Sequence, residues 1–312
     1  MMFVRGRMVD VDLGDLDRWC RAHLSAGVEE VLFRDGYLST VLGVRLSSGQ
    51  PVVVKVRRRA ERLEACWMAH CQLFERGFPC PQPLVAPQPF GEWVASAEAA
   101  VEGGELFPDS ARAPHPFAEA LARLVALAPV PDDLPSLHPR LPWTAWDHEE
   151  RGLWPWPDDR DIDLNAVGGP VWIDEAGRAA RSRLQQSRRD PVIGHGDWYT
   201  ANLRWAGSEL HVAFDWDSII AASAPVVVGL AAAVYPATRG GTEATVQETE
   251  DFLDAYAEIQ GRPFTTDEIE EAWAAGLWNR SFDAKKQLAT EGQPRSLTER
   301  EARQRRERAG VA

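Results

Sequence analysis

Alternation of apolar and polar residues predicts several short strands in the N-terminal third of the chain. We expect strands at residues 31–33, 40–46, 52–56 and 93–96. In the third of these, a period of two places Lys55 on the face opposite Val54 and Val56. The pattern therefore predicts an antiparallel sheet with an aliphatic core face and a lysine on its other face.

Apolar residues at helical spacing predict a helix directly after the third strand. Residues 60–76 carry Leu63 and Trp67 on one side, and Gly77 with Pro79 ends the pattern. This helix follows the lysine strand closely. Its acidic residues are therefore candidates for an ion pair with Lys55.

The rest of the chain is predicted to be mainly helical. We expect helices at residues 117–127, 221–236, 245–259 and 266–282, and a charged helix at 296–310 whose arginines face solvent. Residues 128–191 lack a regular pattern and are rich in proline, aspartate and tryptophan. We expect this segment to be an insertion that is held against the domain by the packing of its tryptophans.

The stretch 191–217, PVIGHGDWYTANLRWAGSELHVAFDWD, contains the clearest chemical signal. A short buried strand is predicted to end just before Asp197. Asn202 follows five residues later, close to the spacing in kinase catalytic loops, where the aspartate accepts the substrate proton and the asparagine binds magnesium. A hairpin at 203–214 then returns the chain and brings Asp215 beside Asn202. A carboxylate and an amide oxygen so placed suit a magnesium ion.

Each residue of this set also has an ordinary structural explanation. Asp197 could cap a helix that begins near Trp198, and Asp215 and Asp217 could be turn residues of a surface hairpin. These roles explain the residues singly but not their combined spacing. Phosphoryl transfer is therefore the better hypothesis. His195 is expected to hold the loop backbone by hydrogen bonds, and Asp217 is expected to support the metal ligands.

The same residues resemble the aminoglycoside phosphotransferase and choline kinase family of the protein-kinase-like fold. In that family the catalytic loop has His-Gly-Asp and an Asn five residues later, as in His195-Gly196-Asp197 and Asn202. A metal-binding aspartate follows the next hairpin, as in Phe214-Asp215. The resemblance implies an α+β, bilobal fold. A small antiparallel-sheet lobe for the nucleotide is expected at residues 1–100, and a mainly helical catalytic and substrate-binding lobe at 101–312.

A kinase of this type also needs residues that hold the phosphates of ATP or GTP. Lys55 is expected to orient the α and β phosphates, with Glu64 as its preferred partner and Glu61 as the alternative. The connection at residues 34–39 is expected to cover the phosphates, with Ser39 and backbone amides facing them. An ordinary hairpin turn is the alternative for this segment.

The segment at residues 98–104 is the expected hinge between the lobes. The adenine base is expected to meet backbone groups there, at Glu98 and Ala100, and a plain linker is the equal alternative. The chain departs from the family at one place: it has Gly229-Leu230-Ala231 where the family commonly has an Asp-Leu-Ala triplet.

Composition limits the remaining possibilities. The chain has 312 residues, of which 45% are apolar and 26% are charged, as in ordinary soluble globular proteins. The net charge of −13 argues against a general nucleic-acid binder. No segment has the apolar length of a membrane span or a signal peptide, so we expect a cytoplasmic protein. The four cysteines lack a metal-binding spacing and are expected to be reduced core residues.

Three functions remain open at this stage. The first is an antibiotic-modifying phosphotransferase with Mg²⁺ and ATP or GTP, whose acceptor is a hydroxyl of an aminoglycoside-like small molecule. The second is a metabolic kinase of an amino alcohol, sugar or nucleoside. The third is a nucleotide-binding pseudokinase module. A metal-dependent hydrolase is disfavoured, because no histidine and carboxylate cluster surrounds Asp197 in the sequence. The sequence fixes neither the acceptor nor the oligomeric state.

Overall fold

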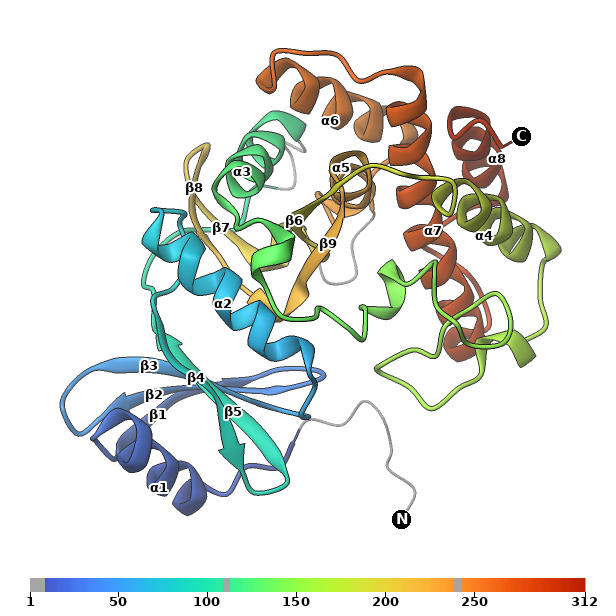
Figure 1. Cartoon of the computed structure of the whole chain (residues 1–312). Helices are drawn as coiled ribbons and strands as arrows, with labels where there is room; N and C mark the ends of the chain where they lie inside the picture. The colour runs from blue at the N-terminus through green and yellow to red at the C-terminus, as the bar shows by residue number, and fades with distance from the viewer. Residues whose placement is uncertain (1–8, 109–112, 238–242, 312) are drawn as a thin grey trace.

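The computed structural model describes residues 9–108, 113–237 and 243–311, which form two parts (Figure 1). The N-terminal part is an antiparallel sheet with a helix beside it, and the C-terminal part is mainly helical. The expected α+β arrangement is confirmed.

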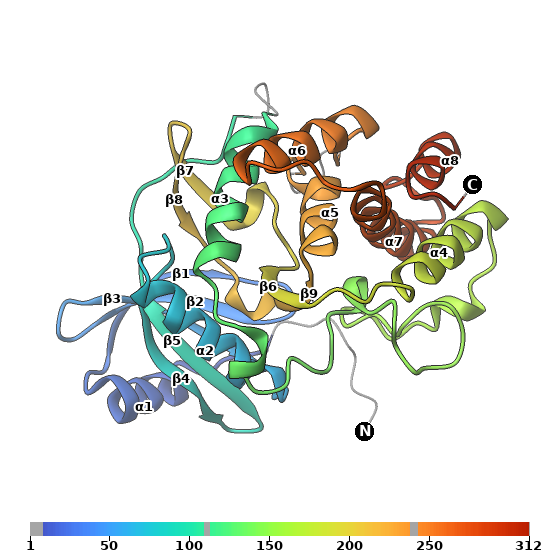
Figure 2. The same cartoon turned by 45° about the horizontal axis from the view of Figure 1, so that its top comes forward.

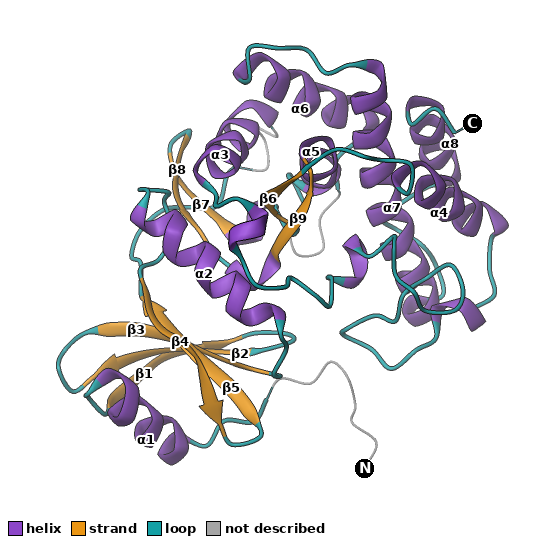
Figure 3. Ribbon diagram, in the orientation of Figure 1, coloured by secondary structure: helices purple, strands orange, loops and turns teal. Residues whose placement is uncertain are grey.

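The N-terminal sheet has five strands in the order β1-β2-β3-β5-β4, each antiparallel to its neighbours (Figure 3). The strands are β1 (Val28–Asp35), β2 (Thr40–Leu46), β3 (Pro51–Arg57), β4 (Pro83–Phe90) and β5 (Trp93–Ala99), and helix α1 (Leu13–Leu24) contacts β1 and β4. Val54 and Val56 are fully buried in the core of the sheet, whereas Lys55 lines a cleft on its other face. The alternation in β3 therefore orients Lys55 as predicted.

Helix α2 (Arg62–Glu75) follows β3 but packs into the C-terminal part of the molecule. Its buried residues Cys66, Ala69 and Leu73 belong to a large hydrophobic core that also contains Phe117. The sheet has a separate core, built from residues between 9 and 97. The lobe boundary at residue 100 stays a prediction, because α2 precedes it in sequence and yet packs with the residues that follow it.

The C-terminal part contains six helices among the described residues and two small antiparallel ladders (Figure 2). The helices are α3 (Pro114–Leu127), α4 (Val171–Leu184), α5 (Ala224–Val234), α6 (Val246–Ile259), α7 (Thr266–Glu291) and α8 (Glu299–Arg308). Strand β6 (Pro191–His195) pairs with β9 (Ile219–Ser223), and β7 (Leu203–Ala206) pairs with β8 (Glu209–Ala213). Helix α7 contacts α4, α5 and α8, so it forms the centre of this part.

The contact between α5 and α7 depends on two glycines. A Cβ added at Gly229 would lie 2.0 Å from the carbonyl oxygen of Ala272, and one added at Gly276 would lie 3.0 Å from the carbonyl oxygen of Gly229. The two helix backbones therefore touch where the family triplet commonly has an aspartate. Position 229 has no room for a carboxylate side chain, so this chain cannot make a supporting hydrogen bond from it.

Three elements differ from the prediction for the C-terminal part. Helix α7 extends to Glu291, beyond the predicted end at residue 282. Residues 221–223 belong to strand β9 rather than to the following helix, because they pair with residues 191–193 of β6. The expected insertion contains helix α4, whose Ile173, Ala176 and Ala180 are fully buried. Their spacing of three and four residues was the signal for this helix. Trp154 of the same segment is buried against Trp278, as expected for a packing residue.

The charged helix α8 exists as predicted, but one of its arginines is not solvated. The side chain of Arg305 is fully buried and donates hydrogen bonds to the carbonyl oxygen of Ala244, at 2.7 Å, and to Oγ1 of Thr249, at 3.2 Å. Its guanidinium group also lies over the ring of Trp273. Helix α8 is therefore anchored by a buried cation, and the prediction of an entirely solvated arginine face was wrong.

We expect Gly229→Ala to destabilise the fold, because the added methyl group meets the backbone of α7 rather than a movable side chain. Overpacking of this kind costs about 1–3 kcal/mol. Thermal unfolding should show a midpoint several degrees lower. Gly168→Ala is the matched control, because Gly168 is exposed and has no atom within 4 Å of the added Cβ. Equal midpoints for the two variants would contradict the tight α5–α7 contact.

Candidate active site

A cleft of about 1050 Å³ lies between the sheet and the C-terminal part. It is lined by side chains from strand β3, from the turn after β1, from α2, from the loop after β6 and from the segment after β8. The predicted residues found in its lining are Ser39, Lys55, Glu98, Asp197, Asn202, Asp215 and Asp217. The structure therefore brings residues more than 150 positions apart into one site.

Lys55 makes ion pairs with two carboxylates of the segment after β8. Its Nζ contacts Oδ1 of Asp215 and lies 2.8 Å from Oδ2 of Asp217. Burial alone would lower the pKa of Lys55, but the charges of Asp215 and Asp217 outweigh it and raise the pKa. Burial opposes ionisation of Asp215, yet the charge and hydrogen bond of Lys55 keep the pKa of Asp215 below its usual range. Both partners are therefore ionised at neutral pH.

The backbone of Asp215 adopts a left-handed conformation, with φ of 64°. Aspartate and asparagine tolerate this region better than most residues with a side chain. Ser218 fixes the turn, because its backbone N–H donates to the carbonyl oxygen of Asp215 at 3.0 Å and its Oγ donates to Oδ2 at 2.9 Å. The turn thus aims the carboxylate into the cleft.

Asp197 and Asn202 are joined directly within the loop after β6. The Nδ2 of Asn202 donates to the carbonyl oxygen of Asp197 at 2.9 Å and to its Oδ2 at 3.0 Å. Burial raises the pKa of Asp197 to about 7, and the charge of Asp215 adds to this effect. The carboxyl group is therefore a stronger base than a solvated aspartate.

His195 is buried beneath this loop and contacts backbone groups on both sides. Its Nε2 lies 3.1 Å from the carbonyl oxygen of Phe214, and its Nδ1 accepts from the N–H of Asp197 at 3.2 Å. Burial lowers the pKa of His195, so the ring is neutral with its proton on Nε2. These contacts link the loop of Asp197 to the segment that carries Asp215, which is the supporting arrangement predicted for this residue.

The turn between β1 and β2 reaches over the cleft to the C-terminal part. Gly36 has a φ of 132°, a conformation that side chains disfavour, and Ser39 is buried in the cleft wall. At the tip, the hydroxyl of Tyr37 donates to Oδ2 of Asp159 at 3.0 Å. Asp159 is also within 3.3 Å of Nζ of Lys286 on α7. The turn is therefore tied to the far wall of the cleft.

The two expected hinge residues lie in different environments. Glu98 lines the cleft, and burial raises its pKa to about 7 although the charge of Lys55 opposes this shift. Ala100 is not among the residues that line the cleft. Its N–H donates to the carbonyl oxygen of Pro51 at 3.3 Å, which extends the pairing of β5 with β3. Of these two residues, only Glu98 lines the cleft.

The structure corrects the predicted ion pair between Lys55 and Glu64. Glu64 and Glu61 are both exposed, and the residues of α2 that line the cleft are Arg62, Leu63, Cys66, Trp67 and His70. Glu64 lies on a different side of the helix, because it is two residues, or about 200°, from Arg62. The sequence pattern predicted the helix correctly but not which of its sides faces the cleft.

Arg57 is a cleft residue that the sequence analysis missed. Its guanidinium group contacts both carboxylate oxygens of Asp217, with Nε 2.7 Å from Oδ2 and a terminal nitrogen 3.0 Å from Oδ1. The signal was present in the sequence, because Arg57 follows Lys55 by two residues and so shares its face of the strand.

The cleft offers the oxygen ligands that magnesium prefers. The amide nitrogen of Asn202 is committed to Asp197, so its Oδ1 is left to act as a ligand. Asp215 is ionised and contributes a carboxylate from the facing turn. The residues present therefore fit a hard divalent cation bound together with phosphate oxygens.

Comparison with known proteins places this chain in a family. Residues 30–271 match the model of the phosphotransferase enzyme family. The chain belongs to this family. Its membership makes the protein a small-molecule kinase. No curated protein matches the sequence significantly.

Solved structures show the same fold at low sequence identity. Spectinomycin phosphotransferase in complex with ADP and spectinomycin has a TM-score of 0.57 and 11% identity, over 95% of this chain and 94% of that one. Amicoumacin kinase with AMP-PNP, Ca²⁺ and Ami has a TM-score of 0.58 and 15% identity, over 90% and 88%. A choline/ethanolamine kinase family protein from Mesorhizobium loti has a TM-score of 0.56 and 17% identity, over 96% and 94%. The predicted bilobal kinase-like fold is confirmed.

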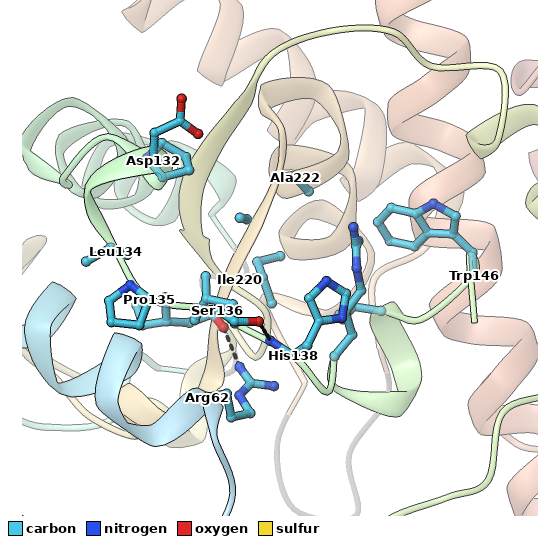
Figure 4. Close-up of a pocket in the computed structure, with 15 residues that line it drawn as sticks. Arg62, Asp132, Leu134, Pro135, Ser136, His138, Trp146, Ile220 and Ala222 are labelled. Atoms are coloured by element: carbon cyan, nitrogen blue, oxygen red, sulfur yellow. Dashed lines mark hydrogen bonds between the residues drawn. The ribbon is translucent and has the colours of Figure 1, made fainter. Parts of the chain in front are cut away.

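A second, smaller cavity of about 430 Å³ lies between the start of α2, residues 131–146 and strand β9 (Figure 4). Two of its charged residues already have partners. Arg62 donates to the carbonyl oxygen of Ile219, and Arg140 lies 3.0 Å from Asp147. Asp132 is the single carboxylate in its described lining. The residues predicted for phosphoryl transfer in this phosphotransferase line the larger cleft and not this cavity.

No helix in the described parts of the phosphotransferase is long and apolar enough to cross a membrane.

We expect His70 to make stability depend on pH. The ring is buried, stacks on Trp216 at 5.0 Å between ring centroids, and places Nε2 2.8 Å from the carbonyl oxygen of Pro81. Burial lowers its pKa from 6.5 to about 4. Between about pH 6.5 and pH 4 the unfolded chain binds a proton on this histidine more readily than the folded chain does. The free energy of unfolding therefore decreases as the pH falls through this range.

The measurement is the free energy of unfolding in urea at pH 7, 5.5 and 4.5, for wild type and His70→Gln. Glutamine keeps an amide donor near Nε2 but does not titrate in this range. The shift corresponds to up to about 3 kcal/mol. The wild-type protein should lose more stability than the variant as the pH falls. Parallel pH profiles would show that His70 is not held neutral by the fold.

Proposed function

We propose that the protein transfers the γ-phosphoryl group of ATP or GTP to a hydroxyl of a small amine-bearing molecule, such as an aminoglycoside-like antibiotic. The observation that carries the proposal is the meeting of Asp197, Asn202 and Asp215 with Lys55 in one cleft. Each of these side chains suits one task of in-line phosphoryl transfer.

Asp197 is the proposed catalytic residue. Asn202 holds one of its carboxylate oxygens, so the other can orient the acceptor hydroxyl and take its proton as the new bond to phosphorus forms. Asn202 and Asp215 are the proposed metal ligands. Magnesium, when bound, supplies neutralisation of the phosphate charge. Lys55 then orients the phosphates through its ammonium group.

Other cleft residues have supporting roles in the proposal. Ser39 and the backbone amides of the β1–β2 turn cover the phosphates, and Glu98 lies beside the base. His195 keeps Asp197 and Asp215 in a fixed relation through its two backbone contacts. Positioning of this kind is the main protein contribution to phosphoryl transfer, because little covalent chemistry falls to the protein.

Carboxyl groups near Asp197 favour an acceptor that carries an amine. Asp158 lines the cleft, and burial raises its pKa to about 6. Burial also raises the pKa of Asp283 on α7, whose charge acts on Asp197. A protonated amine bound among these groups would favour their ionised forms and would offset their desolvation. The spectinomycin in a structure of similar fold supports this class of acceptor.

A metabolic kinase of an amino alcohol is the second candidate. The same carboxyl groups suit its substrate, and a choline/ethanolamine kinase family protein has a similar fold. The pseudokinase alternative is disfavoured, because Lys55, Asp197, Asn202 and Asp215 are all present and meet in the cleft. ATP, GTP and free magnesium are present in the cytoplasm, so a cytoplasmic location remains part of the proposal.

The proposal is tested by release of ADP or GDP with magnesium across a panel of possible acceptors. The panel contains aminoglycosides, spectinomycin, amino alcohols, sugars and nucleosides. Turnover with an amine-bearing acceptor supports the proposal. Turnover restricted to neutral sugars or nucleosides would retain the kinase and overturn the acceptor class.

Asp197→Asn and Asp215→Asn are expected to fail in different ways. Asp197→Asn should keep affinity for the magnesium nucleotide and lower kcat by about 10²–10⁴-fold, because the base is lost. Asp215→Asn should lose nucleotide affinity in the presence of magnesium, because it removes a charged metal ligand while asparagine keeps the left-handed turn. Calorimetry of Mg-ATP binding and steady-state kinetics separate the two effects. Equal nucleotide affinity in both variants would refute these assignments.

Asp158→Asn should weaken binding of the acceptor and leave nucleotide binding unchanged. Loss of one ion pair with an amine corresponds to about a tenfold increase in KM for the acceptor, at about 1.4 kcal/mol. Asp161→Asn is the control, because Asp161 lies in the same segment but is exposed. If both variants keep the wild-type KM with an amine-bearing acceptor, Asp158 does not contact the amine.

A further inference from the structure

Strand β3 carries two cations on its cleft face, Lys55 and Arg57, and both contact Asp217. Arg57 is held from three sides. One terminal nitrogen donates to Oγ of Ser96 on β5 at 2.8 Å and to the carbonyl oxygen of Lys55 at 2.9 Å. The other donates to Oδ1 of Asp217. The Nε lies 2.7 Å from Oδ2 of the same carboxylate, as an ion-pair contact without a hydrogen bond. Arg57 is thus fixed against Asp217 through one hydrogen bond and one ion-pair contact.

Helix α2 provides no acidic partner for Lys55. Its residues in the cleft lining are Arg62, Leu63, Cys66, Trp67 and His70. The first of these is a buried cation, which points to the start of β9 and donates to the carbonyl oxygen of Ile219 (Figure 4). A carboxylate is therefore missing from the helix surface where kinases hold their phosphate-binding lysine.

We propose that Asp217, clamped by Arg57, is the positioning residue that holds Lys55 on the nucleotide phosphates. This inference rests on the proposed kinase function and adds a residue to it. Asp217 lies 2.8 Å from Nζ of Lys55 and follows Asp215 by two residues. The ammonium group has three donors, so one can stay on Asp217 while the others reach the phosphates.

The arrangement separates two tasks that fall on neighbouring carboxylates. Asp215 contacts Lys55 in this structure but is the proposed metal ligand, so that contact must yield when metal and nucleotide bind. Asp217 can keep its contact with Lys55 through this exchange, because Arg57 donates a hydrogen bond to its Oδ1 and lies in ion-pair contact with its Oδ2.

The experiment is a double-mutant cycle on Lys55 and Asp217. Affinity for Mg-ATP by calorimetry and the nucleotide KM and kcat are measured for wild type, Lys55→Met, Asp217→Asn and the double variant. We expect each single variant to weaken nucleotide binding about 10–100-fold. The double variant should be within about twofold of Lys55→Met, because Asp217 acts through the lysine. If the double variant binds Mg-ATP more weakly than Lys55→Met by the full factor seen for Asp217→Asn alone, the proposal is overturned. That result would indicate a separate role of Asp217 at the metal.

Two further variants test the clamp and the helix. Arg57→Gln should repeat the effect of Asp217→Asn, and Arg57→Lys, which keeps the charge but not the guanidinium group, should restore only part of it. Arg57→Gln can replace Asp217→Asn in the cycle if thermal unfolding shows that Asp217→Asn is not folded. Glu64→Gln should stay within about twofold of wild type, because Glu64 is exposed. A loss in Glu64→Gln as large as in Asp217→Asn would assign the role to α2 instead.

Failure of the kinase function gives a different result from failure of this inference. Wild-type protein that binds Mg-ATP but phosphorylates no acceptor contradicts the proposed function, while the affinity cycle still decides the role of Asp217. Wild-type turnover with additive losses in the cycle supports the function and overturns the inference.

Discussion

Four charged side chains across the cleft are the interaction on which the site depends. Lys55 and Arg57 extend from the sheet, and Asp215 and Asp217 extend from the turn after β8. Two cations face two anions, so the group is balanced although it is largely withdrawn from water. Removal of any one member leaves an uncompensated charge, which is costly at partly buried positions. The same contacts join the sheet to the helical part of the molecule.

The loop that carries Asp197 and Asn202 has a rigid support on its other side. Strand β6 leads into the loop and pairs with β9, and β9 leads into α5. The backbones of α5 and α7 touch at Gly229 and Gly276, so α5 cannot shift toward α7. His195 adds a link between the loop and the turn of Asp215. The carboxylates are therefore held by close backbone packing where the family commonly has a polar side chain.

The parts of the site that the sequence predicted well are those set by local spacing. Asp197, Asn202 and Asp215 lie within 19 residues, and one loop and one hairpin determine how they meet. The face of Lys55 follows from the two-residue period of a strand. The partner of Lys55 could not be obtained in this way, because it depends on the rotation of α2 and on a contact over 162 residues between Lys55 and Asp217. Helix α4 was missed because polar residues separate its few apolar positions. The burial of Arg305 was missed because nearly all residues of α8 are charged, so the sequence does not distinguish its buried side.

The contact of Tyr37 with Asp159 joins the turn between β1 and β2 to the far wall of the cleft. This turn, which is proposed to cover the phosphates, contacts a carboxylate next to Asp158, a residue of the cleft lining. Asp159 is shared between this turn and Lys286 of α7, and Lys286 also contacts Asp283. Asp159 therefore links the β1–β2 turn to helix α7, so that the two walls of the cleft are joined through one carboxylate.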